Sequence, residues 1–410
     1  MTGPLRVLAH RDFRLIAIGN MVSQLGFWGQ YVAVGWAART LTESDFLVTV
    51  AFAAQWFPAL LLSPIAGVFA DRYDRRRLVL WGNIAMVAPP AMLGVLIQTD
   101  RITLFWLVAL VLVGGAGQAF TQPAAAAYVP ALVPVDDLHA AIALNAGMTN
   151  STRVLGPALG GSLIAAWGVA WGFHVNAISF LAVAAACALV RIRPSRPPHT
   201  GVGMLHDLRL GIAYTRANRA VARLMLLIAV SAFWMMHSAL MPIFTRDVLD
   251  GDVSTYGLLS AAPGVGFVGA AVLTTMLHTE RQRQTALVIC SFGLGGAILL
   301  FALSRYVPLS LAALGVFGMC YMTIFTIVNS MLVAASHDEY RGRVMGVFAM
   351  CSVGAIPINS LLAGGLVSLL GAANTVLMCG VALTVFNIAF YASGSLAVIR
   401  GQTVAPHATT

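Results

Sequence analysis

Polar side chains recur at helical spacing inside several apolar stretches of this sequence, and they are the side chains best placed to bind a ligand. Residues three, four or seven positions apart lie on one face of a helix, so each stripe predicts a polar wall. The spacing by itself shows that each helix is polar on one side. The candidate residues for ligand binding are Asn20, Gln24, Phe27, Tyr31, Gln118, Gln122, Arg153, Trp234, His237 and Asn329. The alternative for each residue is a hydrogen bond between helices, worth about 0.6 to 2 kcal/mol.

Arg153 is the only arginine that we place deep inside an apolar stretch. A charge at that depth in a membrane is costly, so Arg153 is expected to face a cavity, a partner or a substrate. A neighbouring stripe of the same helix contains Asn145, Thr149, Thr152 and Gly156. A binding role is therefore predicted for Arg153, with a purely structural role as the alternative.

Titratable groups inside the apolar stretches are scarce. All 15 acidic residues map to loops or to the ends of stretches, whereas proton coupling usually relies on a carboxylate at membrane depth. His237 is the only histidine placed in the middle of a stretch, and an imidazole there either titrates near neutral pH or stays neutral as a structural group. The pattern therefore disfavours carboxylate-based proton coupling.

Catalytic and cofactor motifs are not supported by their context. Gly264-Val-Gly266-Phe-Val-Gly269 matches a dinucleotide-binding pattern, but no strand precedes it, so close helix packing explains it better. No Walker loop, metal-ligand spacing or Ser-His-Asp set is found, so we expect no enzyme, no cofactor and no metal. Buried free thiols are expected at Cys187, Cys290, Cys320, Cys351 and Cys379.

The composition shows which kind of element must position these residues. The 410 residues are 59% hydrophobic and 10% charged, with a mean hydropathy of +0.85, whereas soluble proteins carry about 25% charged residues. The net charge of +9 comes from arginines in short clusters between apolar stretches. That distribution argues against nucleic-acid binding and predicts an integral membrane protein.

Twelve apolar stretches reach the ~20 residues that a helix needs to cross a membrane. Lipid forces each one to satisfy its own backbone hydrogen bonds, so helices are predicted, and the continuous runs exclude a β-barrel. The first stretch is too long for a signal peptide, so it is expected to be retained. The predicted spans are 13–38, 46–70, 78–98, 102–125, 139–165, 170–190, 220–246, 254–277, 285–303, 309–333, 344–369 and 373–396.

Arginines between the spans predict the orientation. With twelve spans, 19 arginines lie on the side of the termini, and only Arg39, Arg101, Arg246 and Arg305 lie on the other side. Cytoplasmic loops carry the excess of basic residues. Both termini are therefore expected in the cytoplasm, in a multi-pass protein of the cell membrane.

The chain divides into two related halves. The predicted parts are an N-terminal six-helix half at 1–190, a cytoplasmic central loop at 191–219, a C-terminal six-helix half at 220–396 and a cytoplasmic tail at 397–410. Parallel repeats of six spans predict a transporter with its site between the halves. Offsets of about 201 to 206 relate Phe27-Trp28 to Phe233-Trp234, Pro58 to Pro263, Gly117 to Gly318 and Asp137 to Glu339.

The loop after the second span reads Gly67-Val-Phe-Ala-Asp71-Arg72-Tyr-Asp74-Arg75-Arg76-Arg77, which resembles the signature loop of the major facilitator superfamily. Asp71 is expected near the N-terminus of the eleventh span, where the helix dipole favours an anion. The alternative is that the arginines only set the topology. The predicted conformational latch consists of Gly67, Asp71, Arg72, Arg75, Arg76 and Arg343.

The fifth span reads Arg153-Val-Leu-Gly156-Pro157-Ala-Leu-Gly160-Gly161, which resembles the Gly-Pro-x-x-Gly-Gly signature of exporters in this superfamily. Gly156 and Gly160 are one turn apart and present a flat face for close packing. Pro157 removes a backbone hydrogen bond and allows a kink. Ordinary packing of small residues is the alternative.

Two further features come from the resemblance. In the superfamily, the first, fourth, seventh and tenth helices line the central cavity, and the polar stripes lie on these helices. The segment 336–346, together with the fifth span, looks like the bacterial branch that includes the enterobactin exporter and macrolide efflux pumps. The resemblance implies export of a moderately large amphipathic molecule, such as a drug or siderophore.

We therefore expect an all-α membrane protein with the major facilitator fold that acts as a secondary active exporter. It would work by alternating access as a proton-coupled antiporter, and the partners would be a small-molecule substrate, the lipid bilayer and protons. A monomer is expected. The alternatives are an importer or a lipid flippase of the same fold, or a membrane sensor that does not transport.

Overall fold

The described chain is helical. The computed structural model describes residues 4–128, 130–191, 204–233 and 237–398, which contain sixteen α-helices and no strand. Nine segments of these described residues are long and apolar enough to cross a membrane. The predicted all-α membrane fold is thus confirmed, while the number of twelve crossings stays a prediction.

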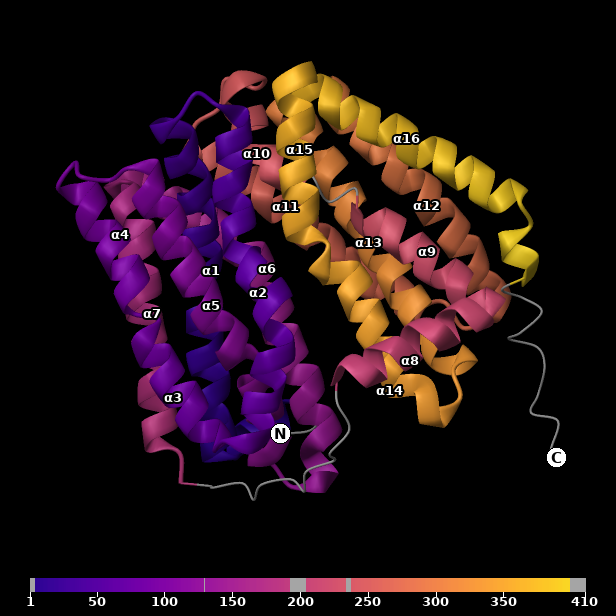
Figure 1. Ribbon diagram of the computed structural model, residues 1–410, viewed down its shortest axis with the longest axis horizontal. Coiled ribbons are helices and arrows are strands. Elements are labelled where there is room, and N and C mark those ends of the chain that lie inside the picture. The colour runs from indigo at the N-terminus through magenta and orange to yellow at the C-terminus, as the bar shows by residue number, and fades with distance from the viewer. Residues whose placement is uncertain (1–3, 129, 192–203, 234–236, 399–410) are drawn as a thin grey trace. The chain divides into compact units, whose positions relative to one another are not determined.

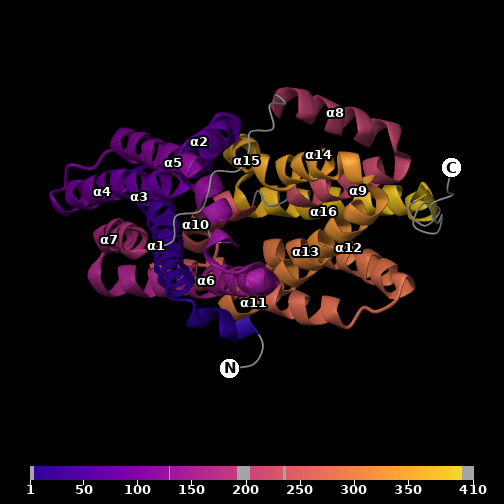
Figure 2. The same cartoon turned by 90° about the horizontal axis from the view of Figure 1, so that it is seen from below.

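The first compact unit combines residues 1–200 with residues 241–261. A cluster of buried side chains that includes Phe13, Ile16 and Tyr128 forms part of its core. In this unit α5 lies beside both α3 and α4 (Figure 2). Its helices are α1 (Arg11–Leu41), α2 (Asp45–Arg72), α3 (Arg75–Ala85), α4 (Ala88–Gln98), α5 (Leu104–Tyr128), α6 (Leu138–Trp167), α7 (Val169–Leu189), most of α10 (His237–Asp247) and the start of α11 (Val253–Thr275).

The second compact unit combines residues 201–240 with residues 262–410. In it α12 lies beside both α13 and α16 (Figure 1). The amphipathic stretch of the central loop is a helix, α8, which packs on α14 through the ring of Tyr214, 4.9 Å from that of Tyr340. The helices of this unit are α8 (Met204–Ala217), α9 (Arg219–Phe233), the rest of α11, α12 (Glu280–Leu303), α13 (Val307–Ala335), α14 (Asp338–Ala349), α15 (Ile356–Leu370) and α16 (Ala372–Ala392).

Two predicted spans, 78–98 and 344–369, each fall within one apolar segment long enough to cross a membrane, but the helix is locally irregular in both. The span 78–98 is broken at Met86–Val87, just before Pro89 and Pro90. Proline cannot donate the backbone hydrogen bond that a continuous helix needs. The span 344–369 is interrupted by a π-helical turn, Met350–Gly354, ahead of Pro357. The span 220–246 includes residues 234–236, which lie outside the described ranges, so its continuity stays a prediction.

Helices α1 and α6 are the long helices that carry the polar stripes. With 31 and 30 residues they are long enough to span a membrane, yet neither is among the nine apolar segments of the described chain. Their polar faces lower the mean hydropathy. Polar faces in a membrane protein must turn toward protein or water rather than lipid, so these two helices are expected to border a polar space.

Small residues let α1 pack tightly against its neighbours. A Cβ atom on Gly26 would lie 3.0 Å from the Cα atom of Asn176 in α7. Close to this contact, the buried amide of Asn176 donates a 2.5 Å hydrogen bond to Gln30 Oε1. Gly19 likewise lies against Ala186 of α7. This close contact, typical of membrane helices, fixes the rotation of α1 about its axis.

Candidate functional site

A cavity of about 200 Å³ lies within the first unit, among α1, α3, α5, α6 and α7. Its polar lining consists of side-chain amides and hydroxyls. None of the described residues that line it carries a formal charge. The polar residues are Asn20, Ser23, Gln24, Asn83, Gln118, Thr121, Gln122, Asn145 and Thr149.

Helical periodicity brings these side chains together. Asn20 and Gln24 are one turn apart on α1, and Gln118 and Gln122 are one turn apart on α5. Residues four apart lie on the same helix face. Asn145 and Thr149 repeat that spacing on α6, so three helices each present a polar edge to the same space.

Apolar side chains complete the wall of the cavity. Their thioethers and rings are polarisable surfaces that adapt to different ligand shapes. The cavity is therefore amphipathic. The largest apolar contributors are Met21, Phe27, Met86, Met148 and Phe180.

The side-chain amides that line the cavity differ in whether they already form hydrogen bonds to protein. Asn83 donates to the carbonyl of Val79 at 2.7 Å, so its amide is partly satisfied within α3. Among the described residues, the amides of Gln24, Gln118 and Asn145 make no hydrogen bond to protein. These amides are available to a molecule in the cavity.

The structure brings together five of the residues proposed from the sequence, namely Asn20, Gln24, Phe27, Gln118 and Gln122. Tyr31 lies elsewhere, buried with its ring 5.1 Å from that of Phe52. Arg153 is half-buried on α6 and is not among the lining residues. Asn329 is half-buried on α13 in the second unit.

Two of the candidate residues lie outside what the structure describes. Trp234 falls between the described ranges, and His237 begins α10 with its side chain undescribed. The cavity also contains Asn83 of α3 and Phe180 of α7, which the sequence analysis did not propose as ligand-binding residues. The signal at Asn83 was a single amide in an otherwise apolar stretch, while Phe180 had no signal at all.

The glycines of the exporter-like motif pack α6 against two different helices. A Cβ atom on Gly160 would lie 2.5 Å from the Cα atom of Gly29 in α1. A Cβ atom on Gly161 would lie 2.8 Å from the Cα atom of Gly257 in α11. Gly156 lies against Trp28, and the carbonyl of Pro157 faces Gly257. The motif therefore serves as a crossing point for α1, α6 and α11.

The start of α11 packs on α1 as well as on α6. Tyr256 is fully buried, and its hydroxyl meets the backbone at Gly35, where an added Cβ atom would collide with it. Its ring stacks on Trp36 with the centroids 6.3 Å apart. The segment 253–257 is thereby held by contacts with two helices of the N-terminal half.

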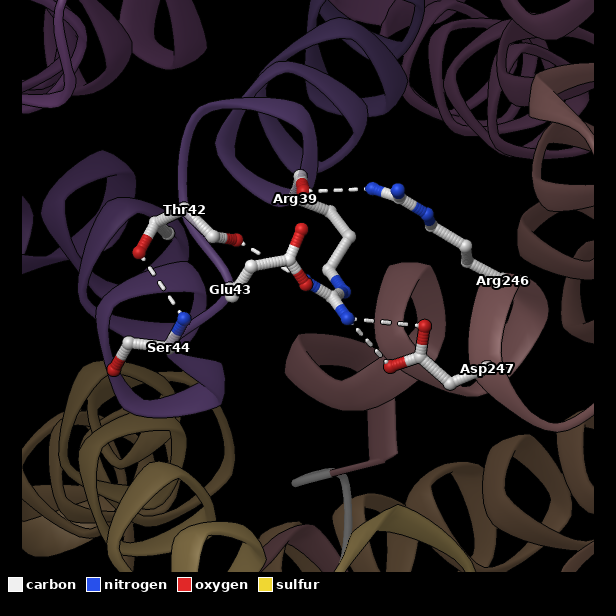
Figure 3. Close-up of polar contacts among 6 residues, drawn as sticks. All are labelled: Arg39, Thr42, Glu43, Ser44, Arg246 and Asp247. Carbon is white, nitrogen blue, oxygen red and sulfur yellow. Dashed lines mark hydrogen bonds and ion pairs between the residues drawn. The ribbon is translucent and has the colours of Figure 1, made fainter.

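A charged cluster at the C-terminal end of α1 ties α10 to the same half (Figure 3). Arg39 Nη2 donates to both carboxylate oxygens of Asp247, at 3.0 and 2.9 Å, and Arg39 Nη1 donates to Glu43 at 2.9 Å. The Arg39 side chain is only 8% exposed, against 35% for Asp247 and 82% for Glu43. A single guanidinium nitrogen contacts both oxygens of Asp247, and such charge-assisted hydrogen bonds are stronger than neutral ones.

Backbone contacts extend the cluster. Arg246 Nη1 donates to the carbonyl of Arg39 at 3.0 Å, and Arg39 Nη1 donates to the carbonyl of Thr42 at 3.1 Å (Figure 3). In the loop, the nearby guanidinium of Arg39 lowers the pKa of the Glu43 carboxyl. Glu43 therefore stays ionised at neutral pH, and its pairing weakens only as the pH falls through that lowered pKa.

The structure describes only part of the proposed latch loop. The surroundings of Gly67 and the side chains of Asp71 and Arg72 lie outside the described set. Arg76 donates to the carbonyls of Cys187 and Ala188 at 2.8 and 2.9 Å, near the C-terminal end of α7. Cations are stabilised at that end of a helix.

Two further arginines of the latch prediction are described. Arg75 is half-buried at the start of α3, and its Nε is buried without a hydrogen bond among the described residues. Arg343 lies over the ring of Tyr340 at 5.3 Å in the second unit. The latch itself stays a prediction.

Comparison with known proteins identifies relatives along nearly the whole chain. A family model described as transmembrane secretion effector matches residues 2–406. The chain is 25% identical to the multidrug efflux pump Tap of Mycolicibacterium fortuitum, covering 87% of this chain and 89% of that pump. It is 19% identical to macrolide efflux protein A of Streptococcus pyogenes, covering 90% and 92%. It is 22% identical to the staphyloferrin A transporter of Staphylococcus aureus, covering 92% and 93%.

Solved structures share the fold at low sequence identity. The nucleoside transporter NupG superposes with a TM-score of 0.76 at 10% identity, over 93% of this chain and 99% of that one. A bacterial homologue of the human lysosomal transporter Spinster gives a TM-score of 0.69 at 14% identity, over 97% and 98%. At these identities the likeness concerns the fold alone.

Proposed function

The chain belongs to the transmembrane secretion effector family of the major facilitator superfamily, and from that premise we propose that it exports an amphipathic small molecule across the cell membrane by alternating access. The observation that carries this proposal is the cavity in the first unit, whose wall combines side-chain amides and hydroxyls with apolar side chains. Pockets of this make-up bind small molecules through apolar contact and use a few polar groups for orientation.

The class of substrate follows from the relatives. Their names describe a multidrug pump, a macrolide efflux protein and a siderophore transporter. We take a drug-like or siderophore-like molecule as the substrate here. The transporter family and the cavity support export of an intact molecule, so no enzymatic role is part of the proposal.

Alternating access assigns a role to the segment 241–261. In this part of the proposal, the Arg39 cluster and the Gly161–Gly257 crossing hold the segment against α1 and α6 in one state and release it in the other. If the termini are cytoplasmic, as the arginine bias predicts, these contacts close the extracellular end. The cavity, lined by residues 17–27 of α1, then lies nearer the cytoplasm.

Coupling to protons and function as a monomer complete the proposal. A proton gradient is the energy source we assign, with His237 as the titratable group suggested by the sequence. An imidazole changes its charge between about pH 5 and 8, so it can bind and release a proton near neutral pH.

Accumulation measurements test the direction and the energy source. The chain is expressed in an efflux-deficient bacterium, and uptake of a macrolide, a tetracycline and a hydroxycarboxylate siderophore is followed. We expect lower accumulation of at least one compound than in cells with an empty vector, and a protonophore should abolish the difference. Higher accumulation would indicate import, and unchanged accumulation of all three would count against export of this class.

A further inference from the structure

The cavity is polar without being charged. Its polar groups come from four helices, α1, α3, α5 and α6, yet no carboxylate or guanidinium is found among the described residues that line it. Arg153 follows Thr149 by one turn on α6, but it is outside the lining and engages a partner of its own. A ligand in the cavity therefore meets only dipoles.

Side-chain amides suit a particular kind of ligand. Each primary amide offers two donors and an acceptor oxygen with two lone pairs, so it can bind a hydroxyl, an ether, a carbonyl or another amide. Gln24, Gln118 and Asn145 come from three different helices and have no protein partner among the described residues. They can therefore hold one neutral, multiply hydrogen-bonding group from three sides.

A charged ligand group would be poorly accommodated. Transfer of an ion out of water is unfavourable unless an opposite charge or several good hydrogen bonds replace its hydration. The cavity offers no opposite charge, and half of its wall is apolar. The same wall penalises an organic cation and an organic anion.

The size of the cavity limits what enters it. Pockets for drug-sized ligands measure about 300 to 1,000 Å³, whereas this cavity measures about 200 Å³. It can hold one ring or one short polar chain, and the remainder of an amphipathic substrate must lie outside it. The cavity is thus a subsite rather than a complete binding pocket.

We propose that this cavity is the recognition subsite for an uncharged, hydroxyl- or amide-rich part of the substrate, such as a sugar ring or a polyol chain. The proposal rests on the export function proposed above and names the substrate class of that same site. It assigns Gln24, Gln118 and Asn145 as the residues that select neutral polar groups over ions.

Three probes with one fluorophore test the selectivity. Dansyl derivatives carrying a glucamine polyol, a trimethylammonium or a carboxylate are titrated into the purified chain in lipid nanodiscs, and dansyl fluorescence reports binding. We expect the polyol to bind at least tenfold more tightly than either ion. Equal or tighter binding of an ion, or no binding of the polyol, would overturn the proposal.

Matched asparagines on one helix test the location. Asn145 and Asn150 are both half-buried on α6, but only Asn145 lines the cavity. Asn145→Leu should weaken polyol binding fivefold or more, and Asn150→Leu should change it less than twofold. Equal effects of the two substitutions would show that the cavity is not the subsite.

A charged isostere tests the mechanism without relying on a loss of function. Gln118→Glu keeps the shape and adds a carboxylate, so it should tighten ammonium binding at least fivefold and weaken carboxylate binding. Unaltered ammonium binding would contradict the assignment of Gln118. The accumulation measurement distinguishes the subsite from the export function. Polyol binding without export would support the subsite and refute the export function. Export that none of these variants affects would support the export function and refute the subsite.

Discussion

The two ends of α1 differ in their chemistry although they belong to one helix. Toward its N-terminal half, Asn20 and Gln24 face a cavity without formal charge, and their amides are open to a ligand. At the C-terminal end, Arg39 is buried and bound to two carboxylates. The helix thus carries neutral amides near the cavity, where we infer that a substrate binds. It carries a charged side chain at the other end, where α10 is held.

The difference has an energetic reason. A buried charge is tolerated only when it is paired, and removal of one partner of a buried pair costs about 3 to 5 kcal/mol. An amide that faces a cavity can bond to water when the ligand leaves, so it contributes little to stability. Substitutions at the two ends should therefore separate a general effect on folding and transport from an effect on ligand choice.

Loss of the charge at Arg39 should have the largest effect. Arg39→Ala leaves Asp247 and Glu43 without their common partner, so we expect the free energy of unfolding to fall by about 2 to 3 kcal/mol. This loss is smaller than that for a fully buried ion pair, because both carboxylates are partly exposed. Export of every substrate should fall at least tenfold. Arg101, which is exposed and unpaired among the described residues, is the control, and Arg101→Ala should stay within about 0.5 kcal/mol. Similar effects of the two variants would contradict the role of the cluster.

Disruption of the crossing between α6 and α11 should have the second-largest effect on stability. In Gly161→Ala the new Cβ atom would lie 2.8 Å from the Cα atom of Gly257 and 2.9 Å from the carbonyl of Val253. Backbone atoms must move to relieve this overlap, so a loss of about 1 to 3 kcal/mol is expected. At Gly147 on the same helix an added Cβ atom meets nothing within 4 Å, so Gly147→Ala should be neutral or stabilising by up to about 1 kcal/mol. Thermal unfolding in detergent measures both, and equal midpoints would exclude a tight crossing.

The cap of α11 should have a smaller and pH-dependent effect. Asp252 accepts hydrogen bonds from the backbone N–H of Thr255 and from the hydroxyls of Ser254 and Thr255, and these lower the pKa of its carboxyl. Asp252→Ala should cost about 1 kcal/mol.

The sign of the pH dependence follows from the lowered pKa. The stabilisation by Asp252 is complete above the ordinary aspartate pKa of about 3.9 and is lost as the pH falls through the lower value of the folded state. The difference in unfolding midpoint between the wild type and Asp252→Ala should thus be constant from pH 8 to 5 and shrink below about pH 4. A difference that grows on acidification would show that the cap does not act through the ionised carboxylate.

The cavity end of α1 should give the smallest effect on stability. Gln24 makes no hydrogen bond to protein among the described residues, so Gln24→Leu should change the free energy of unfolding by less than about 0.5 kcal/mol. Its effect should appear instead as a several-fold rise in KM for a neutral polar substrate. A loss of stability as large as that of Arg39→Ala would remove the contrast between the two ends of the helix.

Much of the fold was predictable because lipid permits few solutions. Runs of apolar residues had to be helices, and the motif after Arg153 correctly indicated the family. The local irregularities in two predicted spans, at Met86–Val87 and at Met350–Gly354, were not expected. Pro89 and Pro90 gave a local signal for one of them, but apolar character continues across the break, so hydropathy alone could not detect it.

The sequence by itself determined which residues share a helix face, because helical geometry repeats every 3.6 residues. That is why Asn20 with Gln24, and Gln118 with Gln122, could be paired in advance. Only the tertiary structure decided which faces meet. It brought Asn83 and Phe180 to the cavity, left Tyr31 outside it, and joined Arg39 to Asp247 across 208 residues. Such contacts depend on how helices rotate and cross. Small residues such as Gly26 and Gly161 permit close packing, but the sequence does not specify that their partners are Asn176 and Gly257.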